Sequence, residues 1–120
     1  MPIIITKRVE QEFYILDLHG DFDFSDRRHF MEAIEHAVKT PYPHIVVNLK
    51  HVPLINSSAL CFLVLAHQKL FLQHHCLSLL NPQPFVRQLL ELANFPKLIP
   101  IYSCLEEIHA QKDRLMTVVS

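Results

Sequence analysis

A chain of 120 residues that is 50% hydrophobic and 19% charged is long enough for one domain with a core of several strands and helices, and too apolar for a disordered protein. Its formal net charge of −1 shows no basic excess of the kind that supports binding to nucleic acid or an anionic membrane. Gly20 is the only glycine, which excludes the glycine-rich loops that hold phosphate in nucleotide-binding enzymes.

The chain opens with two β-rich runs, residues 3–9 and 12–19, separated by Glu10 and Gln11. Such a pair predicts a hairpin, or two neighbouring strands near a sheet edge. The second run sets apolar against polar side chains: Phe13, Ile15 and Leu18 against Glu12, Asp17 and His19. An edge strand at residues 3–9 could pair with another chain, so the expected state is a monomer or a weak dimer.

A helix is predicted over residues 25–39. Its apolar residues recur at helical spacing: Phe30, Ala33, Ile34, Ala37 and Val38. Ser25 is the expected N-cap, and Asp26 is favourable in the first turn. The Thr-Pro-Tyr-Pro segment at 40–43 ends the helix.

Strands and helices alternate after this point. Residues 44–49 form a nearly continuous apolar run, which predicts a central strand covered on both faces. Residues 58–73 are the most hydrophobic helix and should be buried against the sheet. The remaining elements are a strand at 76–80, a helix at 85–93, a short strand at 98–101, and a terminal helix that opens at Ser103 or Cys104 and turns Leu105, Ile108 and Leu115 inward.

The resulting order is β-β-α-β-α-β-α-β-α over one domain, residues 1–120. After the hairpin, right-handed crossovers bring the strands into one sheet with helices packed on it. The fold class is therefore α/β, with a mostly parallel, mixed sheet and about four helices.

Cys61, Cys76 and Cys104 are odd in number, and each has apolar neighbours in the sequence. With no secretory leader at the start, they are expected to be reduced, buried thiols of a cytoplasmic protein. The longest apolar run, residues 59–66, is too short to cross a bilayer, so the protein is not expected to be membrane-embedded.

The chain shows no pattern of catalytic chemistry. His67, His74 and His75 lack the spacing of three or four that places two metal ligands on one helix face. Neither a serine nucleophile elbow nor a catalytic cysteine signature is present. We therefore expect no catalytic residue, no metal and no cofactor, and a protein that is not an enzyme.

Residues 52–60 (Val-Pro-Leu-Ile-Asn-Ser-Ser-Ala-Leu) place two adjacent hydroxyls, Ser57 and Ser58, where a loop enters the most hydrophobic helix. Backbone N–H groups without partners and the positive end of the helix dipole would hold a phosphate there. The alternative is that one serine only caps the helix, which leaves the other free.

Asp21 and Asp23 form a second polar cluster after Gly20, where the second strand ends. Strand-end loops of this kind carry the sites of α/β sheets. They are equally compatible with a purely structural role as loop and pre-cap residues.

Three segments, in this order along the chain, resemble the STAS domain of bacterial anti-sigma factor antagonists. They are residues 18–23 (Leu-His-Gly-Asp-Phe-Asp), 45–49 (Ile-Val-Val-Asn-Leu) and 52–60. Weaker matches continue through residues 77–80, 86–92 and 101–108. The resemblance therefore spans nearly the whole chain.

The resemblance implies a protein-interaction switch in a partner-switching cascade. In that family an anti-sigma factor that is itself a serine kinase, of the GHKL type, phosphorylates the first serine of an Asp-Ser-Ser/Thr-Gly-Leu segment, and a phosphatase resets it. By this resemblance Ser57 is the phosphorylation site, Ser58 is the second choice, and Asp23 matches the nearby acidic residue. The implied partner-binding residues are Asp21, Asp23, Leu54, Ile55, Asn56, Ser57, Ser58 and Ala59.

Two positions depart from the family pattern. Asn56 replaces the usual aspartate, and Ala59 replaces the usual glycine. Loss of the acidic side chain beside Ser57 would alter recognition by a kinase. One alternative is therefore a STAS module that binds its partner without being phosphorylated. Others are an accessory subunit of a membrane (lipid/ABC-type) transport complex, and a module that binds a small ligand in a cavity beneath the helix at 58–73.

Overall fold

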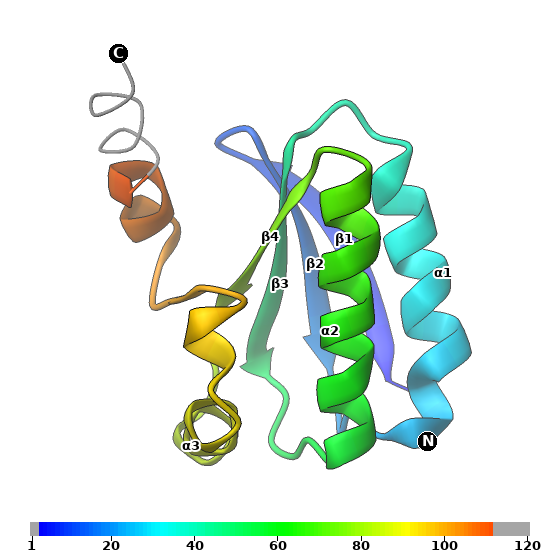
Figure 1. Ribbon diagram of the computed structural model, residues 1–120, viewed down its shortest axis with the longest axis vertical. Coiled ribbons are helices and arrows are strands. Elements are labelled where there is room, and N and C mark those ends of the chain that lie inside the picture. Colours follow the sequence, from blue (N-terminus) through cyan, green and yellow to red (C-terminus); the bar gives the residue numbers. More distant parts are fainter. Residues whose placement is uncertain (1–2, 112–120) are drawn as a thin grey trace.

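The structure is a computed structural model, which describes residues 3–111. A five-stranded sheet runs through it in the order β1 (Ile4–Glu10), β2 (Phe13–His19), β3 (His44–His51), β4 (Cys76–Leu80) and β5 (Ile101–Tyr102) (Figure 1). The first two strands pair antiparallel, and the other neighbours pair parallel. The mixed sheet and its alternation with helices confirm the predicted α/β class.

The helices are α1 (Arg27–Val38), α2 (Ser57–Leu72) and α3 (Pro84–Leu92), and a further helix begins at residue 105 and continues to the last described residue, 111. Figure 1 shows α1 and α2 side by side over one face of the sheet. An ion pair between Glu35 of α1 and Lys69 of α2 links them. The predicted element order is confirmed, whereas Leu115 lies outside the described residues.

The start of α1 differs from the prediction. Asp23, not Ser25, caps the turn that leads into the helix: its side chain accepts hydrogen bonds from the backbone N–H and the hydroxyl of Ser25, at 2.9 Å and 2.6 Å. A short 3-10 turn, η1 (Phe24–Asp26), follows before the α-helix begins at Arg27. Ser25 lies inside this turn, so Asp26, directly before Arg27, is the N-cap of α1, and it makes no side-chain cap hydrogen bond there.

Two other element boundaries differ from their predicted positions. The hairpin turn is Gln11 and Glu12, with φ of 52° and 74°, as a two-residue turn between twisted strands requires. The last strand begins at Ile101, later than predicted, because residues 95–97 form a second 3-10 turn, η2 (Phe95–Lys97). The backbone N–H groups of Leu98 and Ile99 both donate to the carbonyl of Phe95, which delays the extended chain.

The two faces of the sheet have separate cores. We call the side under α1 and α2 the helix face, and the opposite side the far face. On the helix face, strand residues such as Leu16, Leu18 and Val47 join the large core cluster with both helices. On the far face, the helix at 105–111 covers a smaller cluster: Phe13, Ile15, Val46, Leu80, Leu105 and Ile108.

This arrangement corrects the alternation predicted for β2. Leu16 and Leu18 face the helices, whereas Phe13, Ile15 and Asp17 lie on the far face. The strand is apolar on both faces over most of its length because helices cover both, as expected for an interior strand of an α/β sheet. Only its last part is polar on the far face.

The prediction of buried cysteines is wrong. Cys61, Cys76 and Cys104 are all free and exposed. Cys61 is on the outward side of α2, Cys76 is the first residue of β4, and Cys104 precedes the last described helix. Apolar sequence neighbours do not fix which side of a helix or which end of a strand a residue occupies. Within residues 3–111, no helix combines the length and apolarity that a membrane span needs.

Candidate functional site at the start of helix α2

The two loops singled out in the sequence lie against each other. Phe22 and Ile55 form a parallel bridge, the Phe22 N–H donates to the Leu54 carbonyl at 3.0 Å, and the Asn56 N–H donates to the Phe22 carbonyl at 3.3 Å. Both loops follow the carboxyl ends of parallel strands, the edge at which α/β sheets place their sites. The residues that the sequence predicts for partner binding therefore occupy one end of the sheet.

Asn56 is the N-cap of α2. Its backbone is extended, and its side-chain Oδ1 accepts a hydrogen bond from the Ala59 N–H at 3.0 Å. Neither serine is therefore needed as the cap, which removes the purely structural alternative considered above. Asparagine and aspartate cap helices equally well, so Asn56 preserves the helix start while it removes one negative charge beside Ser57.

Ser57 is the first residue of α2, and it is exposed. Ser58 is half-buried and Ala59 is fully buried. The early N–H groups of a helix lack intrahelical acceptors, and the helix dipole makes this end positive. A phosphate on the Ser57 hydroxyl would lie at that end, in solvent, with space around it.

Asp21 and Asp23 have different environments. Asp21 is exposed. Asp23 caps η1, and the hydrogen bonds from the hydroxyl and backbone of Ser25 hold the pKa of its carboxyl below the usual range. Asp23 therefore fixes the loop, and Asp21 is the more exposed of the two carboxylates.

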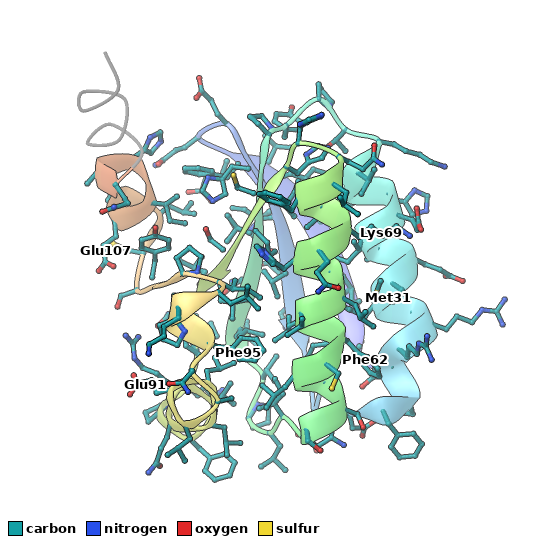
Figure 2. The ribbon with its side chains drawn as sticks, in the orientation of Figure 1. Met31, Phe62, Lys69, Glu91, Phe95 and Glu107 are labelled. Atoms are coloured by element: carbon teal, nitrogen blue, oxygen red, sulfur yellow. The ribbon has the colours of Figure 1, made fainter. Side chains whose placement is uncertain are left out.

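An apolar groove of about 490 Å³ begins at Ser57 and runs between α2 and the segment after α3. Its other lining residues are Leu60, Cys61, Val64, Leu65, Ala93 and Phe95. Figure 2 shows Phe95 on the side of that segment nearest α2. Sequence reasoning missed the groove residues of α2 because it assigned the whole helix to the core. The signal for them was present: a helix that is apolar all round must expose some of that surface when it packs on one side only.

The histidines considered as metal ligands have other surroundings. His75 is buried, and its two ring nitrogens lie 2.7 Å from the Tyr42 carbonyl oxygen and 3.0 Å from that of Val38. His75, which directly precedes β4, therefore contacts both the end of α1 and the loop between α1 and β3. No group of three or more His, Cys, Asp and Glu suited to a metal ion occurs in the part of the chain that the structure describes.

Comparison with known proteins gives a family match over most of the chain. The model of the STAS domain matches residues 5–108. A STAS-domain containing protein of Pseudomonas aeruginosa (strain UCBPP-PA14) is 34% identical over 101 residues, which covers 84% of this chain and 99% of that relative.

Solved structures share the fold at lower identity. An anti-sigma factor antagonist from Mycobacterium paratuberculosis has a TM-score of 0.79 and 20% identity, over 91% of this chain and 92% of its own. The Bacillus cell fate determinant SpoIIAA in its phosphorylated form has a TM-score of 0.64 and 18% identity, over 90% and 97%. At these identities the likeness concerns the fold.

Proposed function

This chain belongs to the STAS domain family, and on that premise we propose that it is a protein-interaction switch of the anti-sigma factor antagonist type, regulated by phosphorylation of Ser57. The observation that carries the proposal is the exposed Ser57 hydroxyl at the positive end of α2, which Asn56 frees from capping.

The surface around Ser57 supports protein binding. Leu54, just before the helix, is 52% exposed, and the groove that starts at Ser57 is lined almost entirely by carbon. Exposed apolar surface of this kind marks protein-interaction sites. The proposed partner is an anti-sigma factor that is also a GHKL-type serine kinase, and a serine phosphatase would restore the unmodified form.

Phosphorylation would end binding by electrostatics. The Ser57 oxygen attacks the γ-phosphorus of ATP, an O–P bond forms as the bond to ADP breaks, and the hydroxyl proton passes to a base of the kinase. The product carries about −1.5 to −2 charges at pH 7. At the mouth of an apolar groove, these charges would have to be desolvated on docking, which opposes association.

The test is a phosphorylation and capture experiment on the full chain. We expect incubation with the partner kinase and ATP to add one phosphate, located by mass spectrometry at Ser57 and lost in Ser57→Ala. Ser57→Ala should still capture the kinase from the native cytoplasm. Ser57→Asp should weaken its Kd about 30-fold, or about 2 kcal/mol.

Gln88→Asp is the matched control, because it adds the same charge at an exposed residue of α3 outside the groove. Equal partner binding by Ser57→Asp and Gln88→Asp would contradict the switch and favour a STAS module that binds without phosphorylation. Stable capture of a transport ATPase, unaffected by Ser57→Asp, would instead identify an accessory subunit of a membrane transport complex.

A further inference from the structure

A second cavity, of about 390 Å³, opens on the far face of the sheet, on the side opposite α1 and α2. It lies where β2, β3 and β4 end, and its polar lining includes His19, Lys50, His51, Asn81 and Ser103. The carboxyl ends of parallel strands are the usual ligand-binding edge of an open α/β sheet. Nothing in the proposed switch at Ser57 uses this cavity.

A β-bulge builds the cavity. Asp17 pairs with Asn48 and His19 pairs with His51, so three steps along β3 oppose two along β2. In a regular strand, consecutive side chains point to opposite faces. The bulge allows Lys50 and His51, which are consecutive, to line the same cavity. Bulges re-aim side chains in this way and are frequent beside functional sites.

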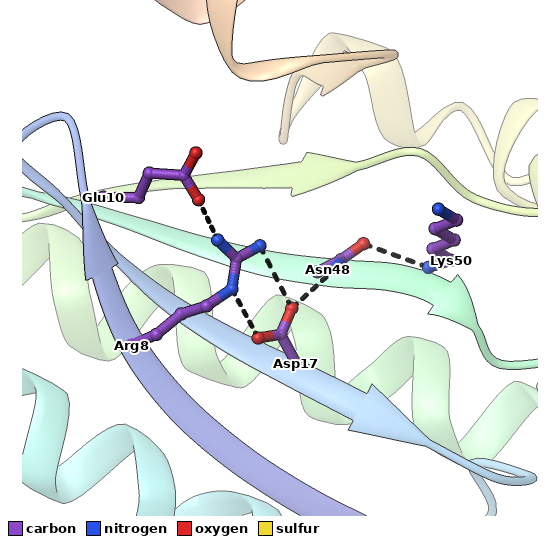
Figure 3. Close-up of polar contacts among 5 residues, drawn as sticks. All are labelled: Arg8, Glu10, Asp17, Asn48 and Lys50. Carbon is purple, nitrogen blue, oxygen red and sulfur yellow. Dashed lines mark hydrogen bonds and ion pairs between the residues drawn. The ribbon is translucent and has the colours of Figure 1, made fainter.

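The floor of the cavity is held rigidly (Figure 3). Arg8 Nε donates to Asp17 Oδ2 at 2.7 Å, and Asn48 Nδ2 donates to Asp17 Oδ1 at 2.6 Å. The Lys50 N–H donates to Asn48 Oδ1 at 3.1 Å, which fixes the orientation of that amide. Arg8 pairs with Asp17 and also with Glu10, so the Asp17 carboxylate in the floor is held in an ion pair.

Hydrogen-bond donors remain around this floor. Among residues 3–111, the Lys50 ammonium, the Asn81 amide and the Ser103 hydroxyl have no side-chain hydrogen bond or ion pair. The rings of His19 and His51 stack with centroids 4.8 Å apart and planes 10° apart, and both side chains line the cavity. The cavity thus combines one ammonium group that has no ion pair, that of Lys50, with further hydrogen-bonding side chains from four different segments.

We propose that this cavity binds a small phosphate-bearing molecule, with Lys50 as its charged anchor and His19, His51, Asn81 and Ser103 as hydrogen-bond donors. A tetrahedral phosphate offers several acceptor oxygens to donors that converge from separate elements, and its hydrogen bonds to a charged donor are strong. The volume is in the range of small-molecule pockets.

The first measurement is an NMR titration of the ¹⁵N-labelled full chain with inorganic phosphate, beside sodium chloride at the same ionic strength. Phosphate should cause saturable shifts at the amides of Lys50, His51 and Asn81 that chloride does not cause. Lys50→Gln should weaken phosphate binding about tenfold. Lys97→Gln, an exposed lysine outside the cavity, should bind as the wild type does.

Ser103→Ala removes a neutral donor without changing charge, and it should weaken phosphate binding several-fold, which tests the site independently of Lys50. Ser57→Ala should leave phosphate affinity unchanged, so this proposal and the switch can fail separately. Shifts no larger than those with chloride, or equal affinities of Lys50→Gln and Lys97→Gln, would overturn it. Shifts centred on Ser58 and Ala59 would place the anion at the start of α2 and would also overturn it.

Discussion

The two faces of the sheet differ in how their side chains are used. On the helix face, β2, β3 and β4 send only apolar side chains into a cluster closed by α1 and α2. On the far face, the same strands begin with Phe13 and Val46 under the last described helix and end with Asp17, Asn48 and Lys50 around an open cavity. The helix face provides the bulk of the folding energy, because burial of apolar area is the main favourable term. The far face keeps a hydrogen-bonded network, Asp17 with Arg8 and Asn48, beside the open cavity.

The proposed switch lies at the edge of the first face. The inward side of α2, with Ala59, Phe62 and Leu63, is packed, while its outward side exposes Cys61 and Leu65 beside the groove. A helix can therefore anchor the core and offer a partner surface at once. The comparison implies that substitutions on the two sides should affect different properties.

The largest effect is expected in the helix-face core. Leu63 is fully buried, and Leu63→Ala should lower the free energy of unfolding by about 3 kcal/mol, since it removes buried methyl groups and leaves a cavity. Leu65→Ala, two residues along the same helix and 42% exposed, should change it by no more than about 0.5 kcal/mol. Urea denaturation measures both. Equal losses in the two variants would contradict the one-sided packing of α2.

The polar half of the far face should contribute less. Asp17→Asn should cost about 2 kcal/mol, because Arg8 and Asn48 donate to different oxygens of Asp17 and the amide replaces one of these acceptors with an NH2 donor. The substitution also removes the charge that pairs with Arg8. Glu10→Gln is the matched control, because Glu10 also pairs with Arg8 but is 48% exposed, so its loss should cost at most about 0.5 kcal/mol. A larger loss in Glu10→Gln would show that Asp17 does not organise the network.

The same network predicts a pH dependence. Burial raises the pKa of Asp17, but hydrogen bonds from Arg8 and Asn48 outweigh it and hold the pKa below its usual value. A depressed folded-state pKa gives stability that is fully present above the unfolded value, about 3.9, and is lost as pH falls through the folded value. The difference in unfolding free energy between wild type and Asp17→Asn should therefore be constant near neutral pH and shrink below about pH 4. A difference that grew on acidification would contradict the sign of the shift.

Much of the fold could be predicted from the sequence because its signals are strong and local. The apolar runs of β3 and β4 and the helical spacing in α1 identified those elements within a few residues. The sequence predicted less well those boundaries that depend on contacts with residues distant in the chain. The hairpin turn at Gln11 and Glu12 lacks the glycine or asparagine that usually marks such turns, and β5 is only two residues long.

The sequence indicated the segment of the candidate site but not which of its residues caps α2. Asn56, Ser57 and Ser58 are three successive residues that can all cap a helix, so only the structure shows that Asn56 does so. The far-face cavity could not be found, because it depends on cross-strand register: Arg8 reaches Asp17 across the hairpin, and a bulge brings His51 beside His19. Register of this kind is set by the packed sheet and not by any one segment.

The smallest predicted effect concerns the point where α2 begins. Asn56→Ala removes the acceptor for the Ala59 N–H and should lower the free energy of unfolding by about 1 kcal/mol. Asn56→Asp keeps that acceptor and adds a negative charge near the positive helix end, so its stability should lie within about 0.5 kcal/mol of the wild type. Thermal and urea denaturation would measure both. If Asn56→Asp were as unstable as Asn56→Ala, the side chain at position 56 would not be the cap, and the Ser57 hydroxyl would no longer be free for a partner kinase.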